Sequence, residues 1–87
     1  MKRDIIFKGT SFSDFLEWRS INKPIFDKIV ELIEETRVEP FSGTGKPEPL
    51  KYQFSGCWSK RISSEHRLIY KVTDKAIEII SCKYHYT

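Results

Sequence analysis

One set of acidic, basic and cationic side chains in this sequence could catalyse a reaction. Its members are Glu48, which lies between two prolines, Lys51, Arg61, the run of Glu65, His66 and Arg67, and the C-terminal Tyr84, His85 and Tyr86. A carboxylate can remove a proton, an imidazolium can deliver one, and fixed cations stabilise the negative charge that develops between them. Metal-free RNA cleavage by the ribose 2′-OH needs such a set, and DNA lacks the hydroxyl. The residues therefore suggest an endoribonuclease as one hypothesis.

The charge of the chain is concentrated in its second half. Residues 1–41 contain seven Lys or Arg against eight Asp or Glu, a net charge of −1, whereas residues 42–87 contain eight against four, a net charge of +4. The basic residues of the second half alternate with aromatic residues, a mixture that can pair with phosphates and stack on unpaired bases. This composition favours RNA binding and an ordinary solvated sheet face about equally.

Length and composition exclude several classes of protein. The 87 residues are enough for a single domain, expected over 1–87. The chain has neither an apolar run of about 20 residues nor the pattern of a signal peptide, so we expect no membrane segment and a cytoplasmic location. The two cysteines are too few for a disulfide framework. Four residues could in principle be zinc ligands: Cys57, His66, Cys82 and His85. They lack the paired spacing of a zinc site, so we expect no metal, and we expect no cofactor.

Two helices are predicted in the first half, after a short strand over 4–7. Ser11 or Ser13 is expected to cap the first helix. Asn22 should cap the second, with Pro24 in its first turn and Pro40 beyond its end. The second helix has an apolar stripe expected in the core, formed by Ile25, Phe26, Ile29, Val30, Leu32 and Ile33. Its exposed side is predicted to carry Asp27, Lys28, Glu31, Glu34 and Glu35.

The second half of the chain is predicted to form a meander of strands. An exposed, partly rigid loop over 41–49 comes first, because it is rich in glycine and proline. The strand segments that follow are 50–54, 58–62, 66–72 and 76–84. Their short connections require antiparallel neighbours. The expected fold is α+β in the order β-α-α-β-β-β(-β), with two helices packed on one face of a twisted antiparallel sheet.

Four segments, in this order along the chain, resemble the YoeB/Txe toxins of the RelE superfamily. The similarity extends over almost the whole chain, and its most specific parts are 45–51, 55–62, 65–70 and 84–86. The resemblance implies a compact RelE-like fold and the toxin of a type II toxin–antitoxin system. It implies a metal-independent mRNA interferase that cleaves messenger RNA in the A site of the 70S ribosome and is neutralised by a YefM-like antitoxin. Whether the chain forms a homodimer stays an open question.

The same resemblance implies roles for individual residues. Glu48 matches the proposed general base, His85 the proposed general acid, and Arg67 the arginine that stabilises the phosphate in the transition state. Tyr86 matches a terminal tyrosine thought to position a base, although Thr87 follows it here. The other residues expected to contact RNA contribute polar or charged groups around the site: Lys46, Lys51, Arg61 and Glu65.

Two other functions stay open from the sequence. A non-catalytic module that binds RNA or the ribosome would need the cationic face but neither Glu48 nor His85. An inactivated toxin could act as a partner or co-repressor of its antitoxin. For single residues, Arg67 and Glu65 could form a surface ion pair, and His66, at the start of a strand, is interpreted as structural.

Overall fold

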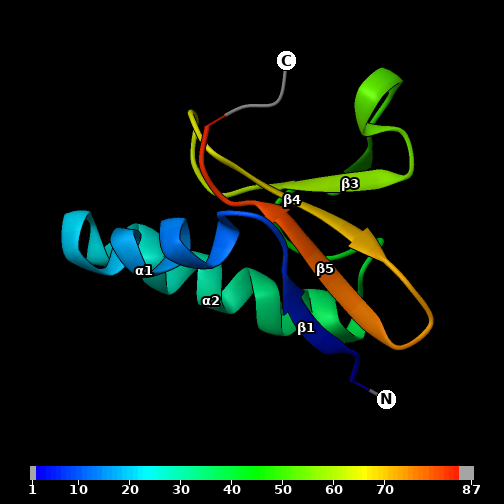
Figure 1. The fold of residues 1–87 in the computed structure, drawn as a ribbon, viewed down its shortest axis with the longest axis horizontal. Helices are drawn as coiled ribbons and strands as arrows, with labels where there is room; N and C mark the ends of the chain where they lie inside the picture. Colours follow the sequence, from blue (N-terminus) through cyan, green and yellow to red (C-terminus); the bar gives the residue numbers. More distant parts are fainter. Residues whose placement is uncertain (1, 85–87) are drawn as a thin grey trace.

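Two helices cover one face of a five-stranded sheet (Figure 1). The structure is a computed structural model that describes residues 2–84. The strands lie in the order β1-β5-β4-β3-β2. The elements, in chain order, are β1 (Asp4–Phe7), α1 (Ser11–Ile21), α2 (Lys23–Val38), β2 (Glu48–Pro49), the 3₁₀ turn η1 (Tyr52–Phe54), β3 (Cys57–Arg61), β4 (Arg67–Val72) and β5 (Ala76–Ser81). The predicted α+β class and the position of the helices are confirmed.

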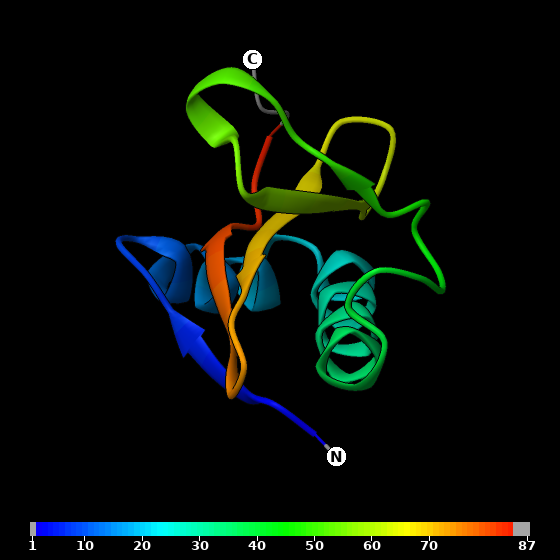
Figure 2. The same ribbon diagram turned by 90° about the vertical axis from the view of Figure 1, so that its right-hand side faces the viewer.

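The sheet is mixed, so the prediction of a purely antiparallel sheet is wrong for one strand. Strands β2 to β5 pair antiparallel with their neighbours, whereas β1 lies parallel to β5, with Asp4 opposite Ala76 (Figure 2). Short turns join β3, β4 and β5 and force the chain to reverse. Almost the whole chain separates β1 from β5, so no turn constrains their relative direction.

The second helix begins and ends as its sequence predicts. The side-chain oxygen of Asn22 accepts a hydrogen bond from the amide of Ile25 at 3.2 Å, and Pro24 lies in the first turn. The last helical residue is Val38, shortly before Pro40. A proline at the start needs no hydrogen-bond partner for its nitrogen, and a proline beyond the end cannot continue the helix. Local sequence therefore determines both ends of α2.

The first helix begins differently from the prediction. Thr10 precedes it without a capping hydrogen bond from its side chain. Ser11 is buried, and its hydroxyl donates to the carbonyl of Ile79 on β5 at 3.0 Å. The hydroxyl of Ser13 donates to the carbonyl of Thr10 at 2.9 Å. Neither serine caps the helix, because Ser11 fastens α1 to the sheet and Ser13 acts as a donor.

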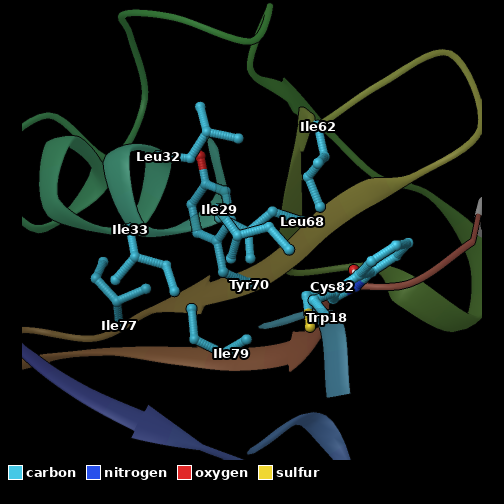
Figure 3. Close-up of a cluster of buried hydrophobic side chains, with 10 residues drawn as sticks. All are labelled: Trp18, Ile29, Leu32, Ile33, Ile62, Leu68, Tyr70, Ile77, Ile79 and Cys82. Atoms are coloured by element: carbon cyan, nitrogen blue, oxygen red, sulfur yellow. The ribbon is translucent and has the colours of Figure 1, made fainter. Parts of the chain in front are cut away.

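The main core fills the space between the helices and the sheet (Figure 3). It consists of side chains from both helices, from three segments of the sheet region and from the chain after β5: Trp18, Ile29, Leu32, Ile33, Ile62, Leu68, Tyr70, Ile77, Ile79 and Cys82. The indole of Trp18 donates to the carbonyl of Cys82 at 3.0 Å. Burial raises the pKa of the Cys82 thiol to about 12, so this thiol is a packing group.

Two strand boundaries differ from the sequence prediction. The segment 50–54, predicted as a strand, contains the turn η1, and the strand pairing lies earlier, in β2. The backbone of Tyr52 has a φ of 58°, in the left-handed region, which interrupts an extended chain. The last strand ends at Ser81 rather than at Tyr84. None of the helices within residues 2–84 is long and apolar enough to cross a membrane.

Candidate active site

The two faces of β3 carry different chemistry. Successive side chains of a strand point to opposite faces. Lys60 points toward the helices, because its ammonium contacts the carboxylate of Glu35 in α2 and the carbonyl of Glu39, just after α2. Ser59 and Arg61 therefore lie on the other face, which we call the open face because neither helix covers it. Arg61 is exposed there.

Three strands bring Glu48, Arg61 and Arg67 to this open face. Glu48 on β2 lies directly opposite Ser59, and Arg61 lies directly opposite Arg67 on β4. Directly paired residues share a face, with Cβ atoms about 5 Å apart, and diagonal neighbours are about 7–8 Å apart. Glu48 is the diagonal neighbour of Arg61. The carboxylate and the two guanidinium groups thus form a row across β2, β3 and β4.

The two arginines face one another without a carboxylate between them. Like charges in direct cross-strand register destabilise a sheet. A nitrogen of the Arg67 guanidinium donates to the carbonyls of Ser63 at 2.7 Å and His66 at 3.0 Å. Among the salt bridges within residues 2–84, none includes Arg61 or Arg67, and none joins Glu65 to Arg67. This pair of cations is well suited to bind a phosphate.

The end of the described chain is fastened to the start of β4. The amide of Arg67 donates to the carbonyl of Tyr84 at 3.1 Å, and the amide of Tyr84 donates to Nδ1 of His66 at 2.7 Å. The His66 ring lies edge-on to Trp18, with ring centroids 4.7 Å apart. His66 therefore has the structural role predicted for it. The predicted acid His85 and its neighbour Tyr86 lie outside the described residues.

A pocket of about 480 Å³ opens beside Glu48. Its lining is one continuous segment, from β2 through η1: Glu48, Pro49, Leu50, Lys51, Tyr52, Gln53 and Phe54. The predicted RNA-binding residue Lys51 thus shares a pocket with Glu48. Lys46 is exposed and follows Gly45, whose carbonyl accepts from the amide of Arg61 at 2.7 Å. Glu65 is exposed in the turn between β3 and β4.

An ion pair between the buried Lys60 and the partly buried Glu35, on the opposite face, holds the loop that leads to Glu48. The side chain of Lys60 is fully buried, and its ammonium lies 3.4 Å from a carboxylate oxygen of Glu35 and 3.3 Å from the carbonyl of Glu39. Glu35 also accepts hydrogen bonds from the amide of Thr44 at 2.8 Å and from its hydroxyl at 3.1 Å. The pair therefore connects α2, β3 and the loop over 39–47.

A second contact holds the beginning of the same loop. The hydroxyl of Tyr70, which is buried on β4, donates to the carbonyl of Pro40. The loop runs from the end of α2 to β2 along the right-hand side of Figure 2. Because Pro40, Thr44 and Gly45 are each hydrogen-bonded to other elements, Glu48 follows a loop of fixed course.

The electrostatics of the ion pair reflect its burial. Burial lowers the pKa of the Lys60 ammonium, and the Glu35 carboxylate opposes this shift. Partial burial alone would raise the pKa of Glu35, but hydrogen bonds from Thr44 and the charge of Lys60 hold it below its usual range. Burial and the nearby Glu35 raise the pKa of Tyr70, which therefore stays a hydrogen-bond donor. The shifts of Glu35 and Tyr70 favour the carboxylate and the neutral phenol that the network uses, whereas burial works against the charge of Lys60 and the Glu35 carboxylate offsets this.

Sequence reasoning missed this pair. Glu35 was predicted on the exposed side of α2, whereas its side chain is only 33% exposed. Lys60 is one of the basic residues that alternate with aromatic residues, and its burial was not predicted. A signal for Lys60 was nevertheless present, because it stands between Trp58 and Ile62 at the spacing of one strand face. Its partner lies 25 residues away, so no local pattern indicates the pairing. Within residues 2–84, no cluster of three potential metal ligands was found.

Comparison with known proteins identifies the family. The model of the YoeB-like toxins of bacterial type II toxin–antitoxin systems matches residues 7–86. The chain belongs to this family. It is 52% identical to toxin YoeB of Escherichia coli (strain K12) over 82 residues, which cover 94% of this chain and 98% of that toxin. The resemblance found in the four sequence segments is therefore confirmed.

Solved structures of YoeB toxins have the same fold. A YoeB dimer from Staphylococcus aureus aligns with a TM-score of 0.89 and 41% identity, over 99% of this chain and 100% of that one. A YoeB-YefM complex from Staphylococcus aureus aligns with a TM-score of 0.87 and 42% identity, with the same coverage. The RelE-like fold expected from the sequence is thus confirmed for a chain of the YoeB family.

Proposed function

We propose that this YoeB-family chain is a metal-independent endoribonuclease that cleaves messenger RNA in the ribosomal A site. The observation that carries the proposal is the strand register, which aligns Glu48 with Arg61 and Arg67 on the open face. Membership of the toxin family supports it. Inhibition of translation by cleavage of the message is the expected result in the cell.

In the proposed mechanism, the Glu48 carboxylate removes the proton from a ribose 2′-OH. The 2′ oxygen then attacks the adjacent phosphorus, and the bond from phosphorus to the 5′ oxygen breaks. His85, which directly follows Tyr84 in the sequence, protonates the departing oxygen. Arg61 and Arg67 stabilise the charge on the phosphorane. The products are a 2′,3′-cyclic phosphate and a 5′-hydroxyl.

The remaining predicted site residues have supporting roles in the proposal. Tyr86 positions a base of the message. Four polar or charged residues flank the scissile phosphate and contact the RNA: Lys46, Lys51, Arg61 and Glu65. A carboxylate is a weak base toward a hydroxyl, so activity depends on the ribosome to orient the message, and free RNA is a poor substrate.

We also propose a YefM-like antitoxin as the partner that inhibits the chain, in the cytoplasm. Similar toxins are solved as YoeB-YefM complexes, and another as a dimer. The row of cations on the open face supports an acidic antitoxin segment that folds on binding. A dimer of this chain is the corresponding proposal for the state without antitoxin.

Primer extension on a message translated by purified ribosomes tests the proposal. We expect wild-type protein to cut in the A-site codon, and Glu48→Gln or His85→Ala to cut about 10²- to 10⁴-fold more slowly with ribosome binding retained. Glu31→Gln, an exposed glutamate of α2, is the matched control and should cut normally.

The other functions predict different results. Translational arrest without cut message would identify a module that only blocks the ribosome. A wild-type chain that neither cuts nor arrests, but still binds antitoxin, would identify an inactivated toxin. Normal cleavage by both Glu48→Gln and His85→Ala would overturn the assigned mechanism.

A further inference from the structure

One tyrosine beside the candidate base is both strained and exposed. The backbone of Tyr52 has a φ of 58°, and 89% of the residue is exposed. The left-handed region is unfavourable for a bulky side chain, and most such positions are occupied by glycine or asparagine. Backbone strain of this kind persists where surrounding structure enforces it, and it is concentrated at functional sites.

Backbone hydrogen bonds, rather than the side chain, enforce this conformation. The amide of Leu50 donates to the carbonyl of Cys57 at 2.9 Å and closes the base of the turn. Within the turn, the amide of Ser55 donates to the carbonyl of Tyr52 at 2.9 Å, and that of Phe54 to Lys51 at 3.2 Å. Across residues 2–84, the Tyr52 ring has no aromatic contact and its hydroxyl no hydrogen bond. The aromatic ring therefore does little to stabilise the fold.

The ring belongs to the pocket that contains Glu48. Glu48, Lys51 and Tyr52 all line this pocket of about 480 Å³, a volume typical of sites for small ligands. Single-stranded nucleic acid is bound by aromatic side chains that stack on bases, next to cations that contact the backbone. The pocket lining includes two aromatic residues, Tyr52 and Phe54, and one ammonium, and Tyr52 is the exposed one of the two aromatics. The open face supplies two guanidinium groups.

We propose that Tyr52 is a stacking platform for a nucleobase of single-stranded RNA. The phosphates of the RNA lie over Arg61 and Arg67, and one of the RNA bases lies against the Tyr52 ring in the pocket. This inference rests on the proposed function for the choice of RNA as ligand. It assigns no step of the reaction to Tyr52, and it adds a second base contact to the one proposed for Tyr86. Stacking explains why a strained position carries a large, exposed aromatic residue.

An RNA probe that cannot be cleaved tests this contact. The probe is a short single strand with every ribose 2′-O-methylated and one base replaced by 2-aminopurine, whose fluorescence falls when it stacks. We expect the wild-type chain and Tyr52→Phe to quench the probe at one base position. Tyr52→Ala and Tyr52→Gly should lose the quenching and bind about 5- to 150-fold more weakly. The melting temperature of Tyr52→Gly should be unchanged or higher, because glycine removes the strain.

Matched variants make the result decisive. Phe12→Ala removes another exposed aromatic residue, from α1 on the helix side of the sheet, and should leave quenching unchanged. The proposal is overturned if wild-type protein quenches no probe, or if Tyr52→Gly binds and quenches like wild type. It is also overturned if Tyr52→Gly weakens only the binding of a YefM-like antitoxin. The probe has no free 2′-OH and cannot be cleaved, so this binding test does not depend on the reaction. Normal cleavage of translated message by Glu48→Gln would overturn the proposed function and leave the result for Tyr52 unchanged.

Discussion

Lys60 and Arg61 are adjacent on β3 and carry the same charge, yet they have opposite environments. Lys60 is fully buried against α2 and paired with Glu35. Arg61 is exposed on the open face, opposite another arginine. The strand's alternation alone separates them. One cation is used to fix a loop in place, and its neighbour keeps its hydrogen-bonding groups for a ligand.

The difference shows how a small domain can position a site. A buried ammonium is unfavourable unless a counter-charge and further hydrogen bonds surround it. Lys60 meets this condition only when Glu35 and the carbonyl of Glu39 are in place, so it selects one course for the loop. Arg61 has no such requirement. The helix side of β3 thus determines geometry, and the open side is available for chemistry.

The largest expected effect is on stability, from removing the partner of Lys60. Glu35→Ala should lower the free energy of unfolding by about 3 kcal/mol, because it leaves a buried ammonium without a counter-charge. Urea unfolding followed by tryptophan fluorescence measures the change. Glu34→Ala is the matched control: Glu34 forms only surface ion pairs, so the loss should be below about 1 kcal/mol. Equal losses would show that the pair with Lys60 stabilises the fold no more than a surface ion pair does.

A smaller effect is expected on cleavage, from the open face. Arg61→Ala should slow cleavage of translated message about 100-fold, because a cation is lost where charge develops. Its stability should change by less than about 0.5 kcal/mol, as is usual for an exposed residue. Lys71→Ala, on the same face at the other end of β4, should cut within about threefold of wild type. A parallel loss of stability in Arg61→Ala would contradict the division between the faces.

The pH dependence of stability should depend on Glu35. The pKa of Glu35 is lowered in the folded state, so below about pH 4.5 the unfolded chain binds more protons than the folded chain. The free energy of unfolding therefore decreases as the pH is lowered. Glu35→Gln lacks this titration. The difference in unfolding midpoint between wild type and Glu35→Gln should therefore be largest near neutral pH and should shrink as pH falls below 4.5. A difference that stays constant down to pH 2 would show that the charge of Glu35 is not the source of the stability difference.

The smallest expected effect is on the salt dependence of RNA binding. A protein cation that neutralises a phosphate of single-stranded RNA contributes about 0.7 to the slope of log affinity against log salt. Arg61→Ala should reduce this slope by about that amount with the 2′-O-methylated probe. Lys60→Met should leave the slope unchanged, because the ammonium is buried. A reduced slope for Lys60→Met would mean that Lys60 reaches the RNA.

Local features of the fold could be predicted from the sequence, and most long-range ones could not. The cap at Asn22 and the end of α2 before Pro40 depend on neighbouring residues, so the predictions for both are correct. The turn at Tyr52 was missed because apolar alternation over 50–54 fits a strand, whereas hydrogen bonds across the turn enforce a left-handed backbone. The parallel pairing of β1 with β5 joins residues more than 70 positions apart, and no local pattern encodes it.

The candidate site was predicted mainly through the family resemblance. Composition could identify Glu48 and the arginines as chemically capable but could not distinguish Glu48 from an ordinary loop charge. The register of β2 with β3 places Glu48 diagonal to Arg61 on the same face. That register depends on the loop over 39–47, and hence on the pair between Lys60 and Glu35, whose residues are far apart in sequence. The roles of His85 and Tyr86 stay predictions.

The two glycines of the loop have a mechanical consequence. A Cβ on Gly43 would lie 2.8 Å from the Glu35 carboxyl group, and one on Gly45 would lie 3.0 Å from the Lys60 Cβ. Glycine here permits close packing, with both residues at positive φ, rather than freedom of movement. A protease needs several residues of extended, detachable chain, and this segment cannot supply them without breaking the loop's contacts. Despite its composition, the segment 43–45 should resist cleavage for as long as the domain stays folded.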